Sequence, residues 1–284
     1  MIIVTGATGA LNGSTVDHLL DRVPAQEIAV VARDVTKAQR FAERGVAVRP
    51  GDYHEPDSLP AAFEGADQLL LVSSSDPASP AVPAHRAAIE AAVRVGVGRI
   101  LYTSHQGAAP DSPFAPARDH FATEQILADS GVAWTSLRNG FYAHSLAWLL
   151  GQWQETGRIT VPGDGPVSWT SREDEGEAAA VILTSGTAYD GPTTITASAA
   201  PTFEEIAMIA SELTGRAIAC EVIDPEAWVA ARTAGGQPEF MVRFLLGMYQ
   251  AAQQGFFAGT DPLLKTLIGR EPATVRDALA GLMA

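Results

Sequence analysis

The sequence predicts an α/β fold of the Rossmann type, in which a doubly wound parallel sheet carries a smaller, mainly helical C-terminal lobe. Two observations predict it. Short, apolar, β-branched runs alternate with helix-length segments through the first half of the 284-residue chain, and parallel strands need such crossover helices. The first run also breaks into Gly6-Ala7-Thr8-Gly9 and then enters a helical segment, which is the order of a phosphate-binding strand–turn–helix unit.

Residues 1–155 are expected to form the dinucleotide-binding domain, because strands and helices alternate throughout this part. The expected strands are Ile2–Thr5, Glu27–Ala32, Val46–Arg49, Gln68–Val72, Arg99–Thr103 and Ala133–Leu137. The expected helices are Ser14–Arg22, Thr36–Arg44, Pro56–Phe63, Pro83–Val95 and Asp119–Ser130.

Residues 156–284 break this rhythm and are expected to form the substrate-binding lobe. The expected strands are Arg158–Val161, Thr193–Ala197 and Ile218–Ile223. The expected helices are Arg172–Thr184, Thr202–Thr214, Pro225–Thr233, Pro238–Gln253, Pro262–Ile268 and Thr274–Met283. Thr202 and Glu205 have the spacing of a capping box. Several strands are expected to return to the main sheet, so that the two parts interleave.

Composition bounds the function. Hydrophobic residues make up 46% of the chain, enough for a full core, and the net charge is −14. A strongly acidic protein is not expected to bind nucleic acid or an anionic membrane, since both need a basic face. The one cysteine, Cys220, excludes an intrachain disulfide and fits a reducing compartment. With neither a signal-peptide pattern nor a run of about 20 apolar residues, the cytoplasm is the expected location, with a monomer and a homodimer both open.

The turn after the first strand is the expected pyrophosphate site. Gly6 makes the turn, Gly9 lets the phosphate approach, and the backbone N–H groups from Thr8 through Ala10 to Leu11 serve as donors. Position 12 departs from the pattern, because Asn12 stands where a third glycine usually allows close helix–strand packing. Three interpretations are open: Gly13 relieves the crowding, Asn12 caps the helix, or the two residues form a local turn.

Arg33 ends the second expected strand and favours NADP(H), since an arginine there suits the 2′-phosphate, whereas an acidic residue would bind the ribose hydroxyls of NAD. Lys37, one helical turn further, could join it. Asp52, after the third strand, is placed to meet the adenine amino group or to be an ordinary turn residue. These three positions predict the adenosine end of the site.

Polar residues also follow the fourth and fifth strands. Ser73, Ser74 and Ser75 come after one, and Thr103 ends the other. Open α/β sheets bind ligands at the carboxyl ends of their strands, so these residues are expected to flank the nicotinamide and its ribose.

Four residues near the same edge are candidate catalytic residues: Ser104, Asn139 and His144 could orient a substrate carbonyl, and Tyr142 could stack on the substrate ring. Together with Phe141, the aromatic rings there could hold a flat substrate or could simply join the two lobes. No His-Glu-x-x-His, Cys-x-x-Cys or paired-carboxylate spacing is present, so no metal site is expected.

The chain resembles the NmrA-like atypical short-chain dehydrogenases/reductases, and within them the type 2 NADPH:quinone oxidoreductases. The matching stretches are Thr5-Gly6-Ala7-Thr8-Gly9, Val31-Ala32-Arg33, Gly51-Asp52-Tyr53, Leu71-Val72-Ser73-Ser74-Ser75, Tyr102-Thr103-Ser104, His120-Phe121-Ala122-Thr123-Glu124 and Leu137-Arg138-Asn139-Gly140-Phe141-Tyr142. The resemblance implies a Rossmann fold, an NADP(H) cofactor and reduction of quinones or related carbonyls. The family that the chain resembles also includes members that bind NADP as a sensor and do not use it in a reaction.

Most short-chain reductases use a Tyr-x-x-x-Lys pair to protonate an alkoxide, but the corresponding helix here carries His120 and Glu124. A quinone tolerates this loss, because hydride addition leaves a phenolate-like anion whose conjugate acid has a pKa near ~10, by analogy with tyrosine. We therefore expect an NADPH-dependent reductase of quinones or quinone-like aromatic carbonyls. The alternatives are a non-catalytic NADP sensor and a tailoring reductase for one aromatic polyketide quinone.

Overall fold

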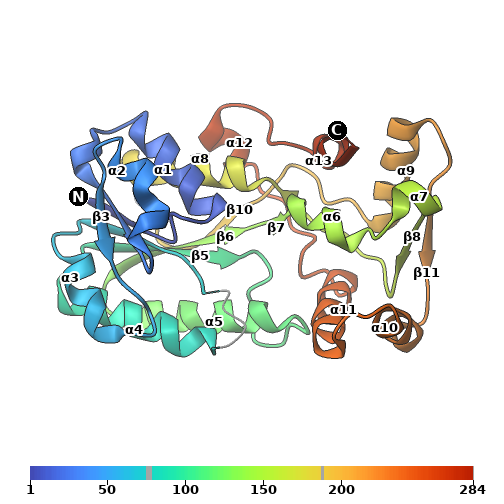
Figure 1. The fold of residues 1–284 in the computed structure, drawn as a ribbon, viewed down its shortest axis with the longest axis horizontal. Coiled ribbons are helices and arrows are strands. Elements are labelled where there is room, and N and C mark those ends of the chain that lie inside the picture. Colours follow the sequence, from blue (N-terminus) through green and yellow to red (C-terminus); the bar gives the residue numbers. More distant parts are fainter. Residues whose placement is uncertain (75–78, 187–188, 284) are drawn as a thin grey trace.

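The computed structural model describes residues 1–74, 79–186 and 189–283, and its centre is a parallel sheet with helices on both faces (Figure 1). Within these residues the sheet has seven strands in the order β10-β6-β5-β4-β1-β2-β3, all paired in parallel. The strands are β1 (Ile2–Thr5), β2 (Ile28–Ala32), β3 (Ala47–Pro50), β4 (Gln68–Leu71), β5 (Arg99–His105), β6 (Ala133–Asn139) and β10 (Gly191–Ile195). β1 and β4 are neighbours, so the chain direction across the sheet reverses there, and the crevice at their carboxyl ends is where such sheets bind ligands.

Helices pack on both faces because the strands are apolar on both sides. One face buries a core under α1 (Ala10–Leu20), α2 (Gln39–Ala42), α8 (Arg172–Thr184) and α12 (Leu263–Ile268). The other face buries a second core under α3 (Leu59–Phe63), α4 (Ala81–Arg94) and α5 (Ala115–Asp129). Short 3₁₀ turns cover Ala25–Glu27, Val35–Ala38, Pro56–Ser58 and Ala143–Ser145.

The C-terminal lobe has its own core and two small sheets. β7 (Phe141–Tyr142) pairs with β9 (Trp169–Thr170), and β8 (Arg158–Val161) pairs with β11 (Ala219–Val222). The lobe's helices are α6 (Leu146–Leu149), α7 (Trp153–Thr156), α9 (Phe203–Thr214), α10 (Pro225–Ala234), α11 (Glu239–Gln253) and α13 (Val275–Met283). α9 begins with the predicted capping box, formed by Thr202 and Glu205.

The Rossmann-type prediction is confirmed, with four corrections. The first helix begins at Ala10 rather than Ser14, and the segment 36–44 divides into a 3₁₀ turn and a short α-helix. Of the expected C-terminal strands in the described residues, β10 alone joins the main sheet, while β8 and β11 pair with each other. The two-residue strands β7 and β9 are too short to show a sequence period, and the sequence analysis missed them together with α6 and α7.

The two parts interleave. Residues 141–169 already contribute to the core of the C-terminal lobe, whereas α8, β10 and α12 return to the main sheet. The stretch that links β6 to α8 therefore passes through the second lobe, and it places the Phe141–Tyr142 strand at the carboxyl edge of the sheet.

Candidate functional site

The turn between β1 and α1 needs glycine for geometric reasons. Gly6 has a φ of +65°, and a Cβ atom there would lie 2.5 Å from Val72 Cγ1. Gly9 is the N-cap of α1, and its own N–H donates to Gly6 O at 3.0 Å. Ala10 and Leu11 form the first helical turn, where N–H groups have no acceptor within the helix. The end of α1 thus suits a phosphate, although the Gly9 N–H, one of the expected donors, is already bonded within the turn.

Asn12 lies inside α1 and neither caps the helix nor forms a separate turn. Its side chain is buried, and its Nδ2 donates to Thr5 O at 2.8 Å. The helix backbone comes close to the preceding turn at the next residue, Gly13, where a Cβ atom would lie 2.9 Å from Ala7 O. The close approach at Gly13 agrees with the interpretation in which Gly13 relieves the crowding, and the capping and turn interpretations are wrong.

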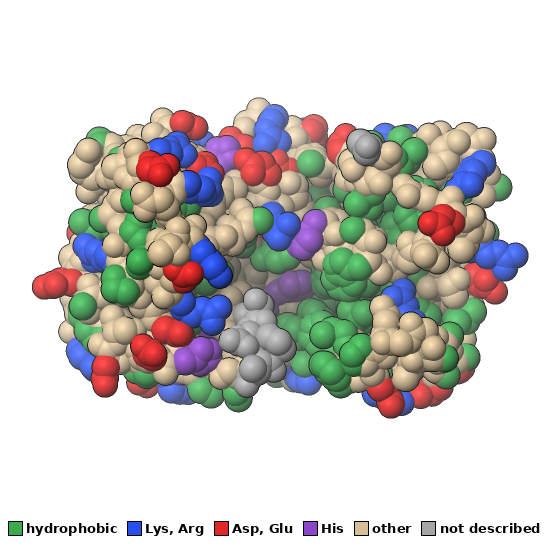
Figure 2. Space-filling view, in the orientation of Figure 1, with side chains coloured by type: hydrophobic (Ala, Val, Ile, Leu, Met, Phe, Trp, Pro, Cys, Tyr) green, Lys and Arg blue, Asp and Glu red, His purple; other side chains and the backbone are tan. Residues whose placement is uncertain are grey.

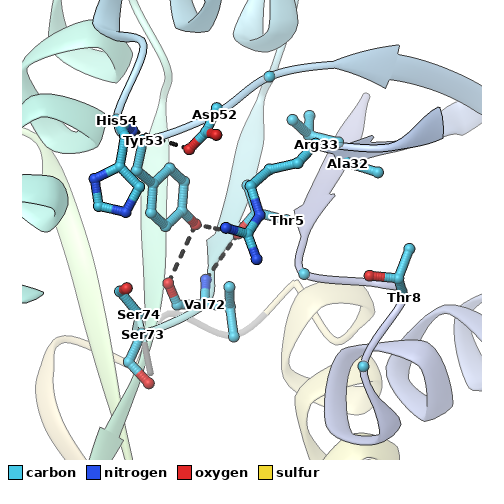
Figure 3. A pocket seen from close by; sticks show the side chains of 14 residues that line it. Thr5, Thr8, Ala32, Arg33, Asp52, Tyr53, His54, Val72, Ser73 and Ser74 are labelled. Carbon is cyan, nitrogen blue, oxygen red and sulfur yellow. Dashed lines mark hydrogen bonds between the residues drawn. The ribbon is translucent and has the colours of Figure 1, made fainter. Parts of the chain in front are cut away.

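A cavity of about 550 Å³ opens at the carboxyl edge of the sheet, beside the glycine turn (Figure 3). Its lining comes from the ends of β1, β2, β3 and β4 and the loops that follow them. The lining residues are Thr5, Gly6, Thr8, Gly9, Val31, Ala32, Arg33, Gly51, Asp52, Tyr53, His54, Val72, Ser73 and Ser74. The cavity is therefore at the switch point between β1 and β4 that the topology defines.

Two of the three residues expected at the adenosine end line this cavity. The Arg33 side chain reaches across it, and Asp52 stands on the opposite loop (Figure 3). Asp52 Oδ1 accepts from the His54 N–H at 3.0 Å, which fixes the loop after β3. Lys37 is exposed and stands apart from the cavity lining.

Sequence reasoning assigned no role to Tyr53, which joins three segments beneath the cavity. Its hydroxyl lies 2.6 Å from Thr5 Oγ1 and 3.1 Å from Val72 O, and Thr5 Oγ1 in turn accepts from the Val72 N–H at 2.8 Å. Burial raises the pKa of Tyr53, so its hydroxyl stays protonated. The signal for this residue was present, since Gly51-Asp52-Tyr53 directly follows a strand at the ligand edge.

The loop after β4 is held by β5 and α4. The Ser73 N–H donates to Thr103 Oγ1 at 2.8 Å, and the Ser74 N–H donates to His85 Nε2 at 2.7 Å. Thr103 is buried and fixes the loop rather than lining the cavity, whereas Ser73 and Ser74 line it. Ser75 lies outside the described residues.

Glu124 organises the polar side chains at the carboxyl ends of β5 and β6. Its Oε1 accepts from Ser104 Oγ and from Ser136 Oγ, each at 2.7 Å. Arg138 completes the network with two bonds, Nε to Oε1 at 3.0 Å and Nη2 to Oε2 at 2.5 Å. Ser104 is buried and its hydroxyl donates to Glu124, so it belongs to this network, and its role in orienting a substrate stays a prediction.

The Asn139-Gly140-Phe141-Tyr142 stretch bends between the two lobes. Gly140 is required there, because a Cβ atom would lie 1.9 Å from Thr170 Oγ1. Burial, with the nearby Glu175 carboxyl, raises the pKa of Tyr142, and a side-chain hydrogen bond with Asn139 partly offsets the shift. The ring of His144 stacks on that of Tyr142, with centroids 5.7 Å apart. The pKa of His144 is lowered, mainly because the ring is partly buried and also because the positive charge of Arg172 is near.

An aromatic cluster continues from this bend into the lobe. The rings of Phe114, Phe141 and Phe257 surround His105 at centroid distances of 6.1, 5.4 and 5.1 Å. Phe244 of α11 adds an exposed ring 5.3 Å from that of Phe114. Figure 2 shows a hollow between the two halves of the molecule, with histidine on its floor and hydrophobic side chains on one wall. Both expected uses of the aromatics, gluing the lobes and lining a surface, are compatible with this arrangement.

Other site types find little support. Among the described residues, no group of three or more His, Cys, Asp or Glu side chains is arranged to hold a metal ion. Burial raises the pKa of the Cys220 thiol to about 11, so it is not a reactive thiolate. No helix in the described ranges combines the length and apolar character needed to cross a bilayer.

The sheet order, the glycine turn and the cavity at the switch point define a dinucleotide-binding protein of the Rossmann class. The residues that surround the cavity fit such a cofactor: Gly6 and Gly9 admit a pyrophosphate beside α1, and Arg33 offers a guanidinium for a phosphate. The chain belongs to the NmrA-like family, which it matches over residues 1–261.

Two sequence relatives and two solved structures illustrate the family. Quinone oxidoreductase 2 of Escherichia coli K12 is 32% identical over 99% of this chain and 98% of its own length. The Escherichia coli NADPH-dependent quinone oxidoreductase, in complex with NADPH, superposes with a TM-score of 0.94 at 31% identity over the whole of both chains. The NAD(P)H azoreductase of Xenophilus azovorans is 32% identical over 96% of this chain and 95% of its own length. The Citrobacter triphenylmethane reductase complexed with NADP(H) has a TM-score of 0.90 at 31% identity, covering 99% of this chain and 100% of its own.

Proposed function

We propose that this chain is an NADP(H)-dependent reductase that transfers hydride to quinones or quinone-like aromatic carbonyl compounds. The cavity of about 550 Å³ carries the proposal, because Gly6, Gly9 and Arg33 converge on it at the edge where Rossmann-type sheets bind dinucleotides. Relatives that match nearly the full chain are a quinone reductase and an azoreductase, which supports the same reaction class.

Each part of the cofactor has a matching group in the chain. The first turn of α1 would hold the pyrophosphate, and Arg33 would pair with the 2′-phosphate, which distinguishes NADP(H) from NAD(H). Ser73 and Ser74 would contact the nicotinamide ribose, and hydrogen bonds to Thr103 and His85 hold them in place. When bound, the reduced cofactor supplies the hydride.

The substrate side favours flat aromatic compounds. The bend at Asn139, Phe141 and Tyr142 follows β6 at the carboxyl edge of the sheet. The exposed ring of Phe244 lies 5.3 Å from that of Phe114. Where most short-chain reductases have the tyrosine and lysine that protonate an alkoxide, this chain has His120 and Glu124. Glu124 forms an ion pair with Arg138. A quinone needs no strong acid, since its product anion has a conjugate-acid pKa near ~10, whereas an aliphatic ketone gives a far more basic alkoxide.

The experiment measures NADPH and NADH binding by fluorescence and then NADPH oxidation with benzoquinone, naphthoquinone and cyclohexanone. We expect preferential binding of NADPH, turnover of both quinones and no turnover of the ketone. F141A and Y142A should weaken quinone turnover more than NADPH binding. NADPH binding without reduction of any quinone would overturn the reductase proposal and support a sensor.

The proposal includes a cytoplasmic location, which the single cysteine favours, and a monomer or homodimer.

A further inference from the structure

A chain of hydrogen bonds connects the cavity wall to a histidine at the edge of the aromatic cluster. It begins at the Ser74 N–H, which donates to His85 Nε2 at 2.7 Å. His85 Nδ1 lies 2.8 Å from Thr123 Oγ1 and 3.5 Å from the hydroxyl of Tyr102. The Tyr102 hydroxyl lies 2.8 Å from Nδ1 of His120. The network of Glu124 described above uses none of these atoms.

The partners fix the position of the proton on His85. A backbone N–H can only donate, so Nε2 is the unprotonated nitrogen. Burial lowers the pKa of His85 to about 4, so the ring is neutral at neutral pH and carries its proton on Nδ1. Thr123 agrees with this assignment, because its single hydroxyl hydrogen is donated to Asp119 O at 2.8 Å, and Oγ1 must therefore accept from His85.

The same reasoning then fixes His120. Tyr102 cannot donate to His85 Nδ1, which already carries a proton. The Thr123 hydroxyl also interacts with Tyr102 but already accepts the proton of His85. Nδ1 of His120 lies 2.8 Å from the Tyr102 oxygen, so we infer that the Tyr102 hydroxyl donates to His120. Burial, helped by the neighbouring His105 and His85, lowers the pKa of His120 well below its usual range. A neutral ring that accepts at Nδ1 carries its proton on Nε2.

His120 Nε2 has no partner among the described residues, and the side chain is partly exposed. Its ring stacks on that of His105, with centroids 6.2 Å apart, and so borders the aromatic cluster around Phe141. His105 also carries its proton on Nε2, since its Nδ1 accepts from the Gly107 N–H at 3.0 Å, but that Nε2 is buried. Of the two imidazoles, His120 is the one whose Nε2 is not among the buried atoms.

We propose that the Nε2–H of His120 donates a hydrogen bond to the substrate carbonyl oxygen, where negative charge develops during reduction. This inference rests on the proposed reductase function and assigns its oxyanion donor. Hydride bonds to one carbonyl oxygen of the quinone, the π electrons shift through the ring to the opposite oxygen, to which His120 donates, and the resulting quinol monoanion takes its proton from water. His120 keeps its proton throughout, because a neutral imidazole is a poor acid, and a fixed donor aimed at a developing charge stabilises it without rearrangement.

His85 and Tyr102 act as positioning residues in this scheme. They hold His120 in the tautomer that presents Nε2–H, much as hydrogen bonds to the far ring nitrogen select the tautomer in other histidine sites. Replacing Tyr102 by phenylalanine keeps the ring but removes the donor, so both tautomers of His120 become accessible and only part of the population presents the proton.

The test compares H120L, which removes the donor, with H120Q, whose amide places an N–H near the position of Nε2. H120L should lower kcat for quinones about 100- to 1,000-fold, with little change in the Kd for NADPH. H120Q should recover most of this loss, and Y102F should show an intermediate kcat. H18L is the matched surface control, since His18 binds Glu173 on the outer side of α1 and α8, and it should behave as the parent. Melting temperatures confirm that each variant is folded.

A second measurement is independent of turnover. Para-nitrophenolate mimics the product oxyanion, and its absorbance reports hydrogen bonds to its oxygen. We expect H120L to bind it more weakly than the parent protein and H120Q to restore binding. A parent protein that reduces no quinone would refute the reductase function, whereas phenolate binding and kcat that are the same in the parent and H120L would overturn the role of His120. Equal losses in H120L and H120Q would also overturn it, because they would show a packing effect.

Discussion

Asn12 Nδ2 donates a hydrogen bond to the backbone oxygen of Thr5 across 2.8 Å, joining the first turn of α1 to the end of β1. Both residues are buried. A buried carbonyl left without a donor costs free energy, so the amide stabilises the turn at the position where Rossmann-type sites usually have a third glycine. The hydrogen bond from Asn12 to Thr5 and the adjacent Gly13 thus compensate for the missing third glycine.

Replacing Asn12 by alanine should lower the free energy of unfolding by about 1–3 kcal/mol, because the Thr5 carbonyl loses its donor. Urea denaturation measures the change. S14A is the control on the same helix: Ser14 Oγ is buried and has no hydrogen-bond partner in the described part of the chain, so its removal should be neutral or stabilising. Equal destabilisation by N12A and S14A would show that lost volume rather than the hydrogen bond matters.

Replacing Arg33 by alanine should weaken NADPH binding by about 10- to 100-fold, the range expected for losing a charge-assisted contact to a phosphate. NADH lacks the 2′-phosphate, so its Kd should change little. K37A provides the comparison, because Lys37 is exposed and stands outside the cavity lining, and we expect less than a threefold effect. Fluorescence titration of both cofactors gives the result, and a parallel loss for NADPH and NADH would contradict the role of Arg33.

The contrast between predicted and missed features follows from what a local pattern can encode. The strands β1, β2 and β4 and the glycine turn are encoded in consecutive residues, and so is Arg33, which ends one of them. Tyr53 and Thr5 come together only through the parallel pairing of distant strands. The same holds for Ser104, which looked available at a strand end until α5 brought Glu124 to its hydroxyl. Residues that depend on a long-range partner are therefore the ones that the sequence left open.

The ion pair between Glu124 and Arg138 should be far more important for stability than the surface pairs. Glu124 is buried and accepts four hydrogen bonds, two of them from Arg138. E124A leaves a partly buried guanidinium and two serine hydroxyls without their acceptor, and it should lower the free energy of unfolding by about 3–5 kcal/mol. E239A, which breaks the exposed pair with Arg243, should cost less than about 1 kcal/mol. Similar costs for both, measured in urea, would refute the structural role of Glu124.

Glu175 should make stability depend on pH in the opposite sense to a salt-bridged carboxylate. The side chain is 2% exposed, and in the ranges described its carboxylate makes no regular hydrogen bond beyond a weak contact with the Gly140 backbone. Burial, with the neighbouring Asp174, raises the pKa of Glu175 well above its ordinary value of 4.5. The folded state therefore keeps this proton to a higher pH than the unfolded chain, which releases it above that value.

Glu175 contributes fully to the free energy of unfolding at pH values below its pKa in the unfolded chain. This contribution is lost as the pH rises toward the pKa of Glu175 in the folded protein. E175Q keeps the shape but removes the titration. Its stability advantage over the parent should be near zero at about pH 4 and should grow toward pH 8, by about 1.4 kcal/mol per pH unit between the two pKa values. E90Q, on the exposed side of α4, controls for the substitution itself and should show no such trend. Urea unfolding across this pH range decides the matter, since an advantage that stays constant with pH would mean that Glu175 is ionised in the folded protein.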